Sequence, residues 1–189
     1  MEKVDAAFFI GHAEARGWHM HDAQGSGMMV DYSSAVNWRW GVGRLRWIFV
    51  MGCGPLEDAA LWGRTILDNT ICVEINDVFG RWVPRFDGLR ALLGFGSVTV
   101  CYSSWPQGFL EQARQPGTPL IDAWFSSAIE LQSDSNSYSG PPQGPTIYVG
   151  ALWAEKGDES ARNDVLIGED ASMDPIRDPD RYVALWSPC

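Results

Sequence analysis

Two short apolar runs, each ending at a glycine, constrain the fold of this chain more than any other feature. Residues 6–10 (AAFFI) are followed by a glycine and His12, and residues 45–51 (LRWIFVM) are followed by a glycine and Cys53. Short apolar runs of this kind are typical of strands buried on both faces of a parallel sheet. The sequence therefore predicts two buried strands that end alike, one at a histidine and the other at a cysteine.

The patterns beyond these runs predict an α/β arrangement. Apolar residues recur at helical intervals over 56–67 and 120–131, and β-branched residues mark strands at 97–102 and 146–153. Residues 13–43 show neither period, which predicts a long loop. In α/β sheets the reactive groups lie at the carboxyl ends of the strands, which is where His12 and Cys53 stand.

The length of 189 residues and a hydrophobic content of 46% fit one compact domain. We expect an α/β core over residues 1–132 and a flexible loop over 133–145, where turn-forming residues dominate. Residues 146–189 then form a C-terminal extension that packs on the core.

The net charge limits the classes of partner that the protein is expected to bind. The formal net charge is −10, from 14 Lys and Arg against 24 Asp and Glu, and no cluster of basic residues interrupts it. Phosphate recognition needs clustered cations, so we expect no nucleic acid partner. An apolar stretch of about 18 residues, which a spanning helix needs, is absent, and so is the layout of a signal peptide. We expect a soluble, cytoplasmic protein without a membrane partner.

The cysteines and histidines suggest no metal site or cofactor. The cysteines lack the CxxC spacing of zinc or redox sites and are expected to be reduced: Cys53, Cys72, Cys101 and Cys189. His19 and His21 form a His-x-His pair that could bind zinc together with His12 and Asp22 or Asp31. Paired loop histidines are usually solvated, however, so we expect no metal there.

The pairing of Cys53 with His12 has a specific chemical meaning. A histidine within hydrogen-bond reach of a thiol raises the thiolate fraction, and the thiolate is the nucleophilic form. The same imidazole can then protonate a leaving group. The other three cysteines have no comparable partner and are interpreted as structural.

The two strand ends resemble those of the caspase-like cysteine peptidases, a superfamily that includes gingipains, legumains and separases. In that group a hydrophobic strand leads to the histidine and the next hydrophobic strand leads to the cysteine. The resemblance implies a caspase-like three-layer α/β fold with a mostly parallel sheet. It also implies that Cys53 is the nucleophile, that His12 is the general base and acid, and that backbone N–H groups at Cys53 and Ala13 form the oxyanion hole.

A narrower resemblance covers most of residues 5–132. Trp82 and the segments 86–89, 94–96 and 122–125 are similar to those of a bacterial and fungal caspase-like family whose activity is unassigned.

Two departures from the superfamily affect the site and the sheet. Ala13 stands where most members have glycine, which restricts the backbone next to His12. Only five residues precede the histidine strand, whereas the caspase sheet has two strands there. The sheet is therefore expected to be shortened at its N-terminal side, with an edge strand that a second copy of the chain or the strand at 146–153 could cover. A homodimer is the simplest cover.

Aromatic and acidic residues near the expected strand ends are candidates for substrate binding: Trp18, His19, Asp87, Trp105, Asp122 and Trp124. Core packing is the alternative for the tryptophans, and turn formation or helix capping is the alternative for the aspartates.

Three functions follow from these patterns. The first is a cysteine-dependent hydrolase, peptidase-like or amidase-like, that uses the dyad of His12 and Cys53. The second is a biosynthetic enzyme that cyclises or rearranges a small molecule, with His12 as acid or base. The third is a non-catalytic binding module. The substrate would be a peptide or a small molecule.

Overall fold

The computed structural model describes residues 5–21, 27–32, 39–58, 63–67, 77–97, 99, 103–131, 147–167 and 174–189, with only the backbone described for 63–67. Within these residues the main sheet has the strand order β1-β5-β7-β8-β10-β6, and the short β9 pairs with β8. The strands are β1 (Ala6–Ile10), β5 (Trp47–Met51), β6 (Gly63–Leu67), β7 (Ala91–Phe95), β8 (Tyr148–Lys156), β9 (Glu159–Ser160) and β10 (Arg181–Pro188).

The sheet is mixed, which corrects the expectation of a mostly parallel one. β1, β5 and β7 run parallel, but the pairs β7–β8, β8–β10 and β10–β6 are antiparallel. The physical reason is that the C-terminal segment returns to the sheet as two long neighbouring strands. The segment predicted as an extension therefore supplies β8 and β10 to the sheet itself, while residues 133–145 lie outside the described ones.

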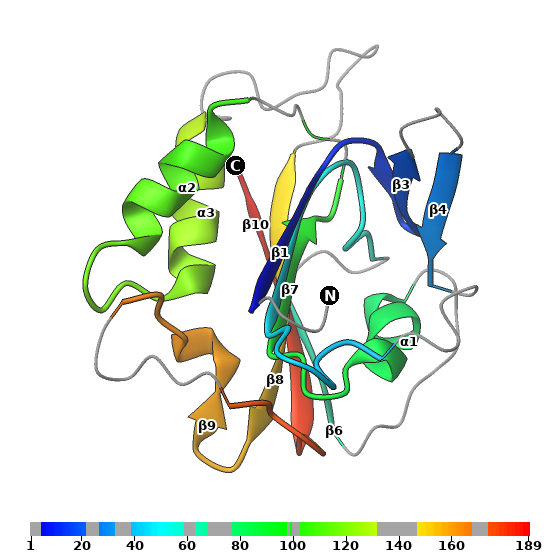
Figure 1. Ribbon diagram of the computed structural model, residues 1–189, viewed down its shortest axis with the longest axis vertical. Coiled ribbons are helices and arrows are strands. Elements are labelled where there is room, and N and C mark those ends of the chain that lie inside the picture. Colours follow the sequence, from blue (N-terminus) through cyan, green and yellow to red (C-terminus); the bar gives the residue numbers. More distant parts are fainter. Residues whose placement is uncertain are drawn as a thin grey trace.

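Two further layers cover the sheet (Figure 1). The helices α2 (Trp105–Ala113) and α3 (Leu120–Leu131) lie on one face. On the other face lie α1 (Val78–Trp82) and a small sheet of β2 (Ala13–Glu14), β3 (Gly17–His21) and β4 (Gly27–Asp31). Two short 3-10 helices, η1 (Val83–Arg85) and η2 (Ala161–Asn163), complete the elements of the described residues. No helix in the described part of the chain is long and apolar enough to cross a bilayer.

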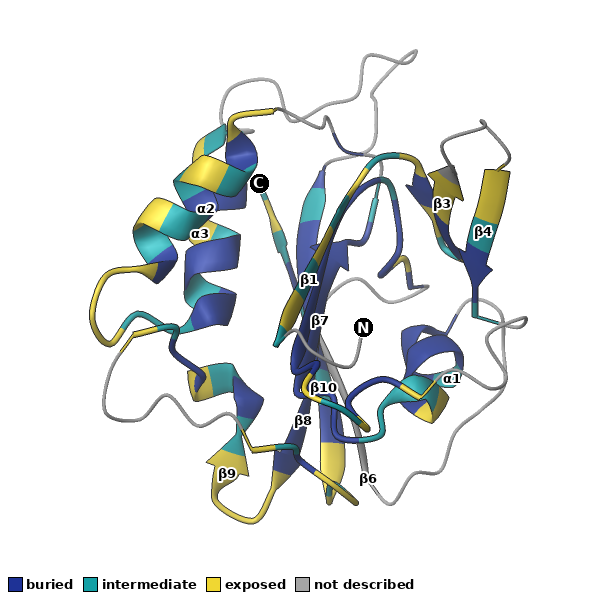
Figure 2. Cartoon of the chain, viewed as in Figure 1, coloured by how far each residue is buried: buried dark blue, intermediate teal, exposed yellow. Residues whose placement is uncertain are grey.

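Aromatic side chains fill the core on both faces of the sheet. Under α2 and α3, Phe49 of β5 packs against Phe109 and Trp124 at ring-centroid distances of 4.9 and 5.7 Å. On the other face three rings stack at 5.6 to 5.7 Å from one another, and we call them the tryptophan stack: Trp18, Trp40 and Trp82. Figure 2 shows the sheet buried between the layers. Each buried ring stabilises the fold by roughly 1.5–3 kcal/mol.

Several predicted elements are confirmed. The helix predicted at 120–131 is α3, whose buried residues recur every three to four positions. The strand predicted at 6–10 is β1, but it is an edge strand and is not buried on both faces. Phe8 is 42% and Ile10 48% exposed, and within the described residues no strand pairs with the outer side of β1. The strand predicted at 146–153 is β8, which does not cover this edge. Pairing with a second copy stays a prediction.

Two predictions about secondary structure are wrong. Residues 63–67, expected in a helix, form β6 because β-branched residues such as Thr65 and Ile66 pair with β10. The apolar run at 91–95 forms the third parallel strand, β7, whereas of the strand predicted at 97–102 only residues 97 and 99 lie within the described part of the chain. The expected loop at 13–43 contains β2, β3 and β4, which are too short to show a period.

Candidate active site

The register of β1 and β5 places His12 and Cys53 at equivalent positions. Ile10 lies opposite Met51 at the carboxyl ends of the two parallel strands. The Gly11 N–H donates to the Met51 carbonyl oxygen at 3.1 Å, so the pairing continues one residue beyond β1. His12 and Cys53 each follow the last paired residues by two positions. The two residues predicted as the dyad are therefore at adjacent strand ends.

Gly52 allows these strand ends to touch. A Cβ atom at Gly52 would lie 2.5 Å from the Gly11 carbonyl oxygen and 2.6 Å from the Ala13 Cβ, closer than real contacts. Gly54 has φ of +63°, a left-handed conformation that glycine adopts without strain, and its N–H donates to the Ser97 carbonyl oxygen at 2.9 Å. The segment that carries Cys53 is thus packed between the ends of β1 and β7.

The Cys53 side chain faces the end of β7. It is half-buried, and its Sγ lies 3.6 Å from the Thr99 carbonyl oxygen, to which the thiol donates. No hydrogen bond between Cys53 and His12 is among the interactions of the described residues. The thiol therefore bonds to the Thr99 carbonyl oxygen, while the backbone at Gly52 contacts the strand end that carries His12.

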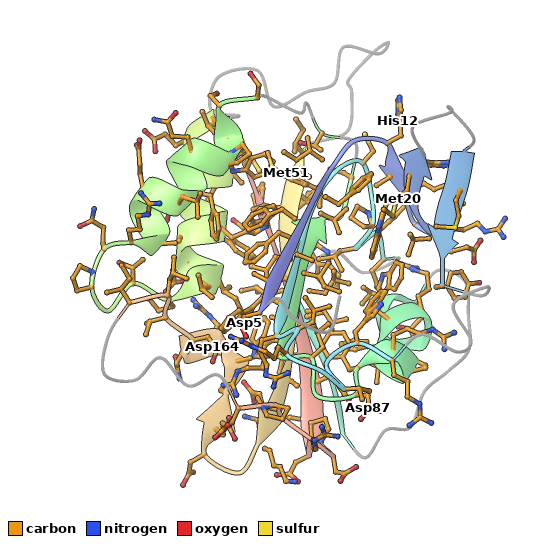
Figure 3. All side chains as sticks on the ribbon, viewed as in Figure 1. Asp5, His12, Met20, Met51, Asp87 and Asp164 are labelled. Atoms are coloured by element: carbon orange, nitrogen blue, oxygen red, sulfur yellow. The ribbon has the colours of Figure 1, made fainter. Side chains whose placement is uncertain are left out.

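The His12 side chain is exposed and projects beyond the end of β1 (Figure 3). Its carbonyl oxygen accepts a hydrogen bond from the His19 N–H at 2.9 Å, which ties the end of β1 to β3. An open hollow of about 340 Å³ lies here, lined by Phe9, Ile10, Gly11, His12, His19 and Met20. His19, predicted to bind substrate, is therefore next to His12, and Cys53 is not part of this lining.

Ala13, predicted to contribute to an oxyanion hole, lies in β2 beside the cysteine segment. Its side chain is buried, and its backbone nitrogen would be 3.2 Å from a Cβ at Gly52. The backbones of Ala13 and Cys53 therefore flank the same contact between the strand ends. This is a suitable place for two N–H donors to approach one carbonyl oxygen.

The three tryptophans predicted to bind substrate are core residues. Trp18 is 6% exposed, and Trp105 and Trp124 are fully buried. Trp18 belongs to the tryptophan stack, while Trp105 of α2 and Trp124 of α3 stack on each other at 4.8 Å. Their size and apolar surface are used in packing.

The two aspartates predicted to bind substrate lie at the amino end of the parallel strands. Asp87 precedes β7 and forms ion pairs with Arg39 at 3.2 Å and Arg177 at 3.6 Å. Figure 3 shows Asp87 and His12 toward opposite ends of the molecule. Asp122, in the first turn of α3, pairs with Arg162 of η2. Neither aspartate is brought to His12 and Cys53, because both form surface ion pairs elsewhere.

The other candidate ligands and thiols are only partly described. Among the described residues, no group of three His, Cys, Asp or Glu side chains could hold a metal ion. The side chain of His21 and the residues Cys72 and Cys101 lie outside the described part. Cys189 is half-buried, and burial raises the pKa of its thiol to about 11, against the lowering effect of a backbone hydrogen bond at Val149.

One of the residues that shape the site has a signal in the sequence, and another has none. Gly52 repeats the glycine that ends the first strand, and this repeat is the signal for its role in the contact between the strands. The carbonyl of Thr99 carries no such signal, because its position depends on the path of the chain after β7.

Comparison with known proteins places the chain in a family. No curated protein and no solved structure matches it. One family model, described as a domain of unknown function (DUF6345), matches residues 1–188, nearly the whole chain. The chain belongs to the DUF6345 family.

Proposed function

We propose that this protein is a cysteine-dependent hydrolase of the caspase-like kind, with Cys53 as nucleophile and His12 as general base and acid. The observation that carries the proposal is the equivalent position of these two residues, each two places beyond the Ile10–Met51 pair of adjacent parallel strands. Reactive groups of α/β sheets gather at this end of the strands. Within the described residues β1 is the edge strand of the main sheet, and a caspase-like sheet shortened beside the histidine strand would have this arrangement.

The proposed reaction follows from these positions. The Cys53 thiol transfers its proton to His12 as its sulfur attacks the carbonyl carbon of a peptide or amide bond. The N–H groups of Cys53 and Ala13 hold the oxyanion, and the departing amine takes the proton from His12. Water then cleaves the thioester, which releases the acid and restores the thiol. In these reaction steps the thiol turns from the Thr99 carbonyl oxygen toward His12. Hydrogen bonds between catalytic groups often tighten only when the substrate is bound.

A second candidate function has its own supporting observation. The open hollow includes His12 and apolar side chains such as Phe9 and Met20, but it does not include Cys53. This lining suits a small apolar molecule on which His12 acts alone as acid or base, in a cyclisation or rearrangement. The two functions differ in whether the thiol is needed.

The first test is the reactivity of Cys53 toward iodoacetamide at neutral pH, with modified peptides quantified by mass spectrometry. We expect Cys53 to react much faster than Cys189, whose raised pKa keeps it protonated. His12→Ala should slow the reaction of Cys53, whereas His19→Ala, a change at the neighbouring exposed histidine, should not. Equal rates for Cys53 and Cys189 would remove the main support for a dyad.

The second test separates the two candidate functions. Cys53→Ser and His12→Ala are compared on a panel of fluorogenic peptidyl amides and in ligand screens against the hollow. Loss of amide hydrolysis in both variants supports the hydrolase. If His12→Ala abolishes turnover of a small molecule while Cys53→Ser retains it, the second function is favoured. A ligand that binds both variants unchanged and is never turned over would point to a binding module.

A further inference from the structure

One face of the small sheet carries two imidazoles and a thioether in a single row. Ala13 lies opposite Trp18, and the hydrogen bond from the His19 N–H to the His12 carbonyl oxygen extends this register by one residue. His12 therefore lies opposite His19, and His19 lies opposite Met29 of β4. The row therefore brings residues 12, 19 and 29 side by side, although they are not adjacent in the sequence.

The side chains of this row point outward. The adjacent row contains Ala13, Trp18 and Val30, all buried against the core, and side chains alternate between the two faces of a sheet. His12 and His19 are accordingly exposed and Met29 is half-buried. Directly opposed residues of antiparallel strands have Cβ atoms about 4.5–5.5 Å apart. The two imidazoles and the thioether therefore start from neighbouring positions on one face of the small sheet.

This donor set selects a soft metal ion. Thioether sulfur is a good ligand for Cu⁺ and a poor one for hard cations, whereas imidazole binds copper readily. The next row on the same face contains Glu14 and Asp31, about 7 Å along the strands. Asp31 pairs with Arg16 at 2.8 Å, and the Glu14 carboxylate is exposed. A negative charge near the row favours a cation.

We propose that His12, His19 and Met29 form a site for one Cu⁺ ion with two nitrogen ligands and one sulfur ligand. The site shares His12 with the proposed dyad, so bound Cu⁺ would compete with the proton of the thiol for the His12 imidazole. That consequence depends on the proposed function, but the metal site itself does not. Its test therefore measures metal affinity and leaves hydrolysis aside.

The test compares two neighbouring methionines that face opposite ways. Met29 belongs to the row, whereas Met28 pairs with Met20 on the other face. The full chain, with its accessible thiols alkylated by iodoacetamide, competes anaerobically for Cu⁺ against the chromogenic chelator bicinchoninate. We expect Met29→Leu to weaken binding by more than about tenfold, because even outer-shell partners of metal ligands contribute that much. Met28→Leu should leave affinity unchanged.

Two additional readouts complete the test. His19→Ala should abolish competition for Cu⁺, and the methyl NMR signal of Met29 should shift on Cu⁺ addition while that of Met28 does not. Leucine has nearly the volume of methionine, so both leucine variants are expected to fold. Equal affinities for Met28→Leu and Met29→Leu, or full binding by His19→Ala, would overturn the proposal.

Discussion

The two ends of the parallel strands are built in contrasting ways. At the amino end, Arg90 and Asp164 are 1% and 4% exposed and share two hydrogen bonds of 2.7 and 2.6 Å. The indole N–H of Trp47 also donates to Asp164, at 2.7 Å. At the carboxyl end, His12 is exposed, and the Cys53 thiol makes one long contact of 3.6 Å to a carbonyl oxygen. Figure 3 shows His12 and Asp164 toward opposite ends of the molecule.

This difference indicates that the amino end holds the fold together, whereas the carboxyl end carries the residues that we propose to react. The amino end has buried charges that are fully hydrogen-bonded. Burial alone would lower the pKa of Arg90, but hydrogen bonds to Asp164 and Glu159 raise it and keep the guanidinium charged. The carboxyl end is held by backbone contact at Gly52, and there the His12 side chain is exposed and Cys53 is half-buried. Changes at the amino end should therefore affect stability, and changes at the carboxyl end should affect reactivity.

The largest expected effect is at Arg90. Arg90→Met leaves the carboxylate of Asp164 buried without its cationic partner, so we expect a loss of about 3–5 kcal/mol in the free energy of unfolding. Urea denaturation measures this loss of stability. The matched control is Arg162→Met, which breaks the partly exposed pair with Asp122 and should cost less than about 1 kcal/mol. Similar losses for both variants would contradict the contrast between a buried network and surface pairs.

A smaller effect is expected at Gly52. Gly52→Ala places a Cβ against Gly11 and Ala13, which should separate the strand ends and destabilise the protein by about 1–3 kcal/mol. We also expect slower alkylation of Cys53 at neutral pH.

Gly108→Ala in α2 is the matched control for Gly52→Ala. Its new Cβ would lie 3.8 Å from the nearest Leu131 atom, an ordinary contact, so alanine should stabilise that helix by about 0.5–1 kcal/mol. Gly52→Ala could instead be as stable as Gly108→Ala, with Cys53 alkylated at the same rate as in the unmodified chain. That result would show that close contact of the strand ends matters neither for stability nor for the reactivity of Cys53.

The sequence predicted those parts of the fold in which local pattern and tertiary environment agree. The pattern predicts strand β1 and helix α3 with their observed bounds, and it predicts that His12 and Cys53, the proposed dyad, lie at the ends of adjacent strands. In these segments the apolar period directly reflects the buried face. The glycines before His12 and Cys53 gave the matching signal for the site.

The remainder depends on long-range pairing, which a single sequence does not reveal. β6 pairs with β10, which lies more than a hundred residues later in the chain. The helical spacing of the apolar residues at 56–67 therefore did not predict the strand. The buried tryptophans were proposed as substrate contacts because ring size alone does not distinguish a core from a pocket. The alignment of His12 with His19 depends on the register of β2 and β3, which only the folded chain defines.

The smallest expected effect is a pH dependence at the amino end, at Glu155 of β8. Burial would raise the pKa of this carboxyl, but hydrogen bonds from Ser160, Trp153 and Arg181 lower it below its usual value. A carboxyl with a lowered pKa stabilises the fold fully above its unfolded-chain pKa, about 4.3, and this contribution is lost as pH falls through the folded value. The stability of the unmodified chain should therefore decrease on acidification in this range.

Glu155→Gln tests this contribution. At neutral pH the variant should be less stable by on the order of 1 kcal/mol, and the difference should vanish under acid conditions, where Glu155 is protonated. Urea unfolding at a series of pH values measures both curves. The matched control is Glu14→Gln, at the exposed carboxylate of β2 near the carboxyl end. If that control changes the pH profile as much as Glu155→Gln does, acid sensitivity is not a property of the buried amino end, and the contrast between the two ends does not extend to their electrostatics.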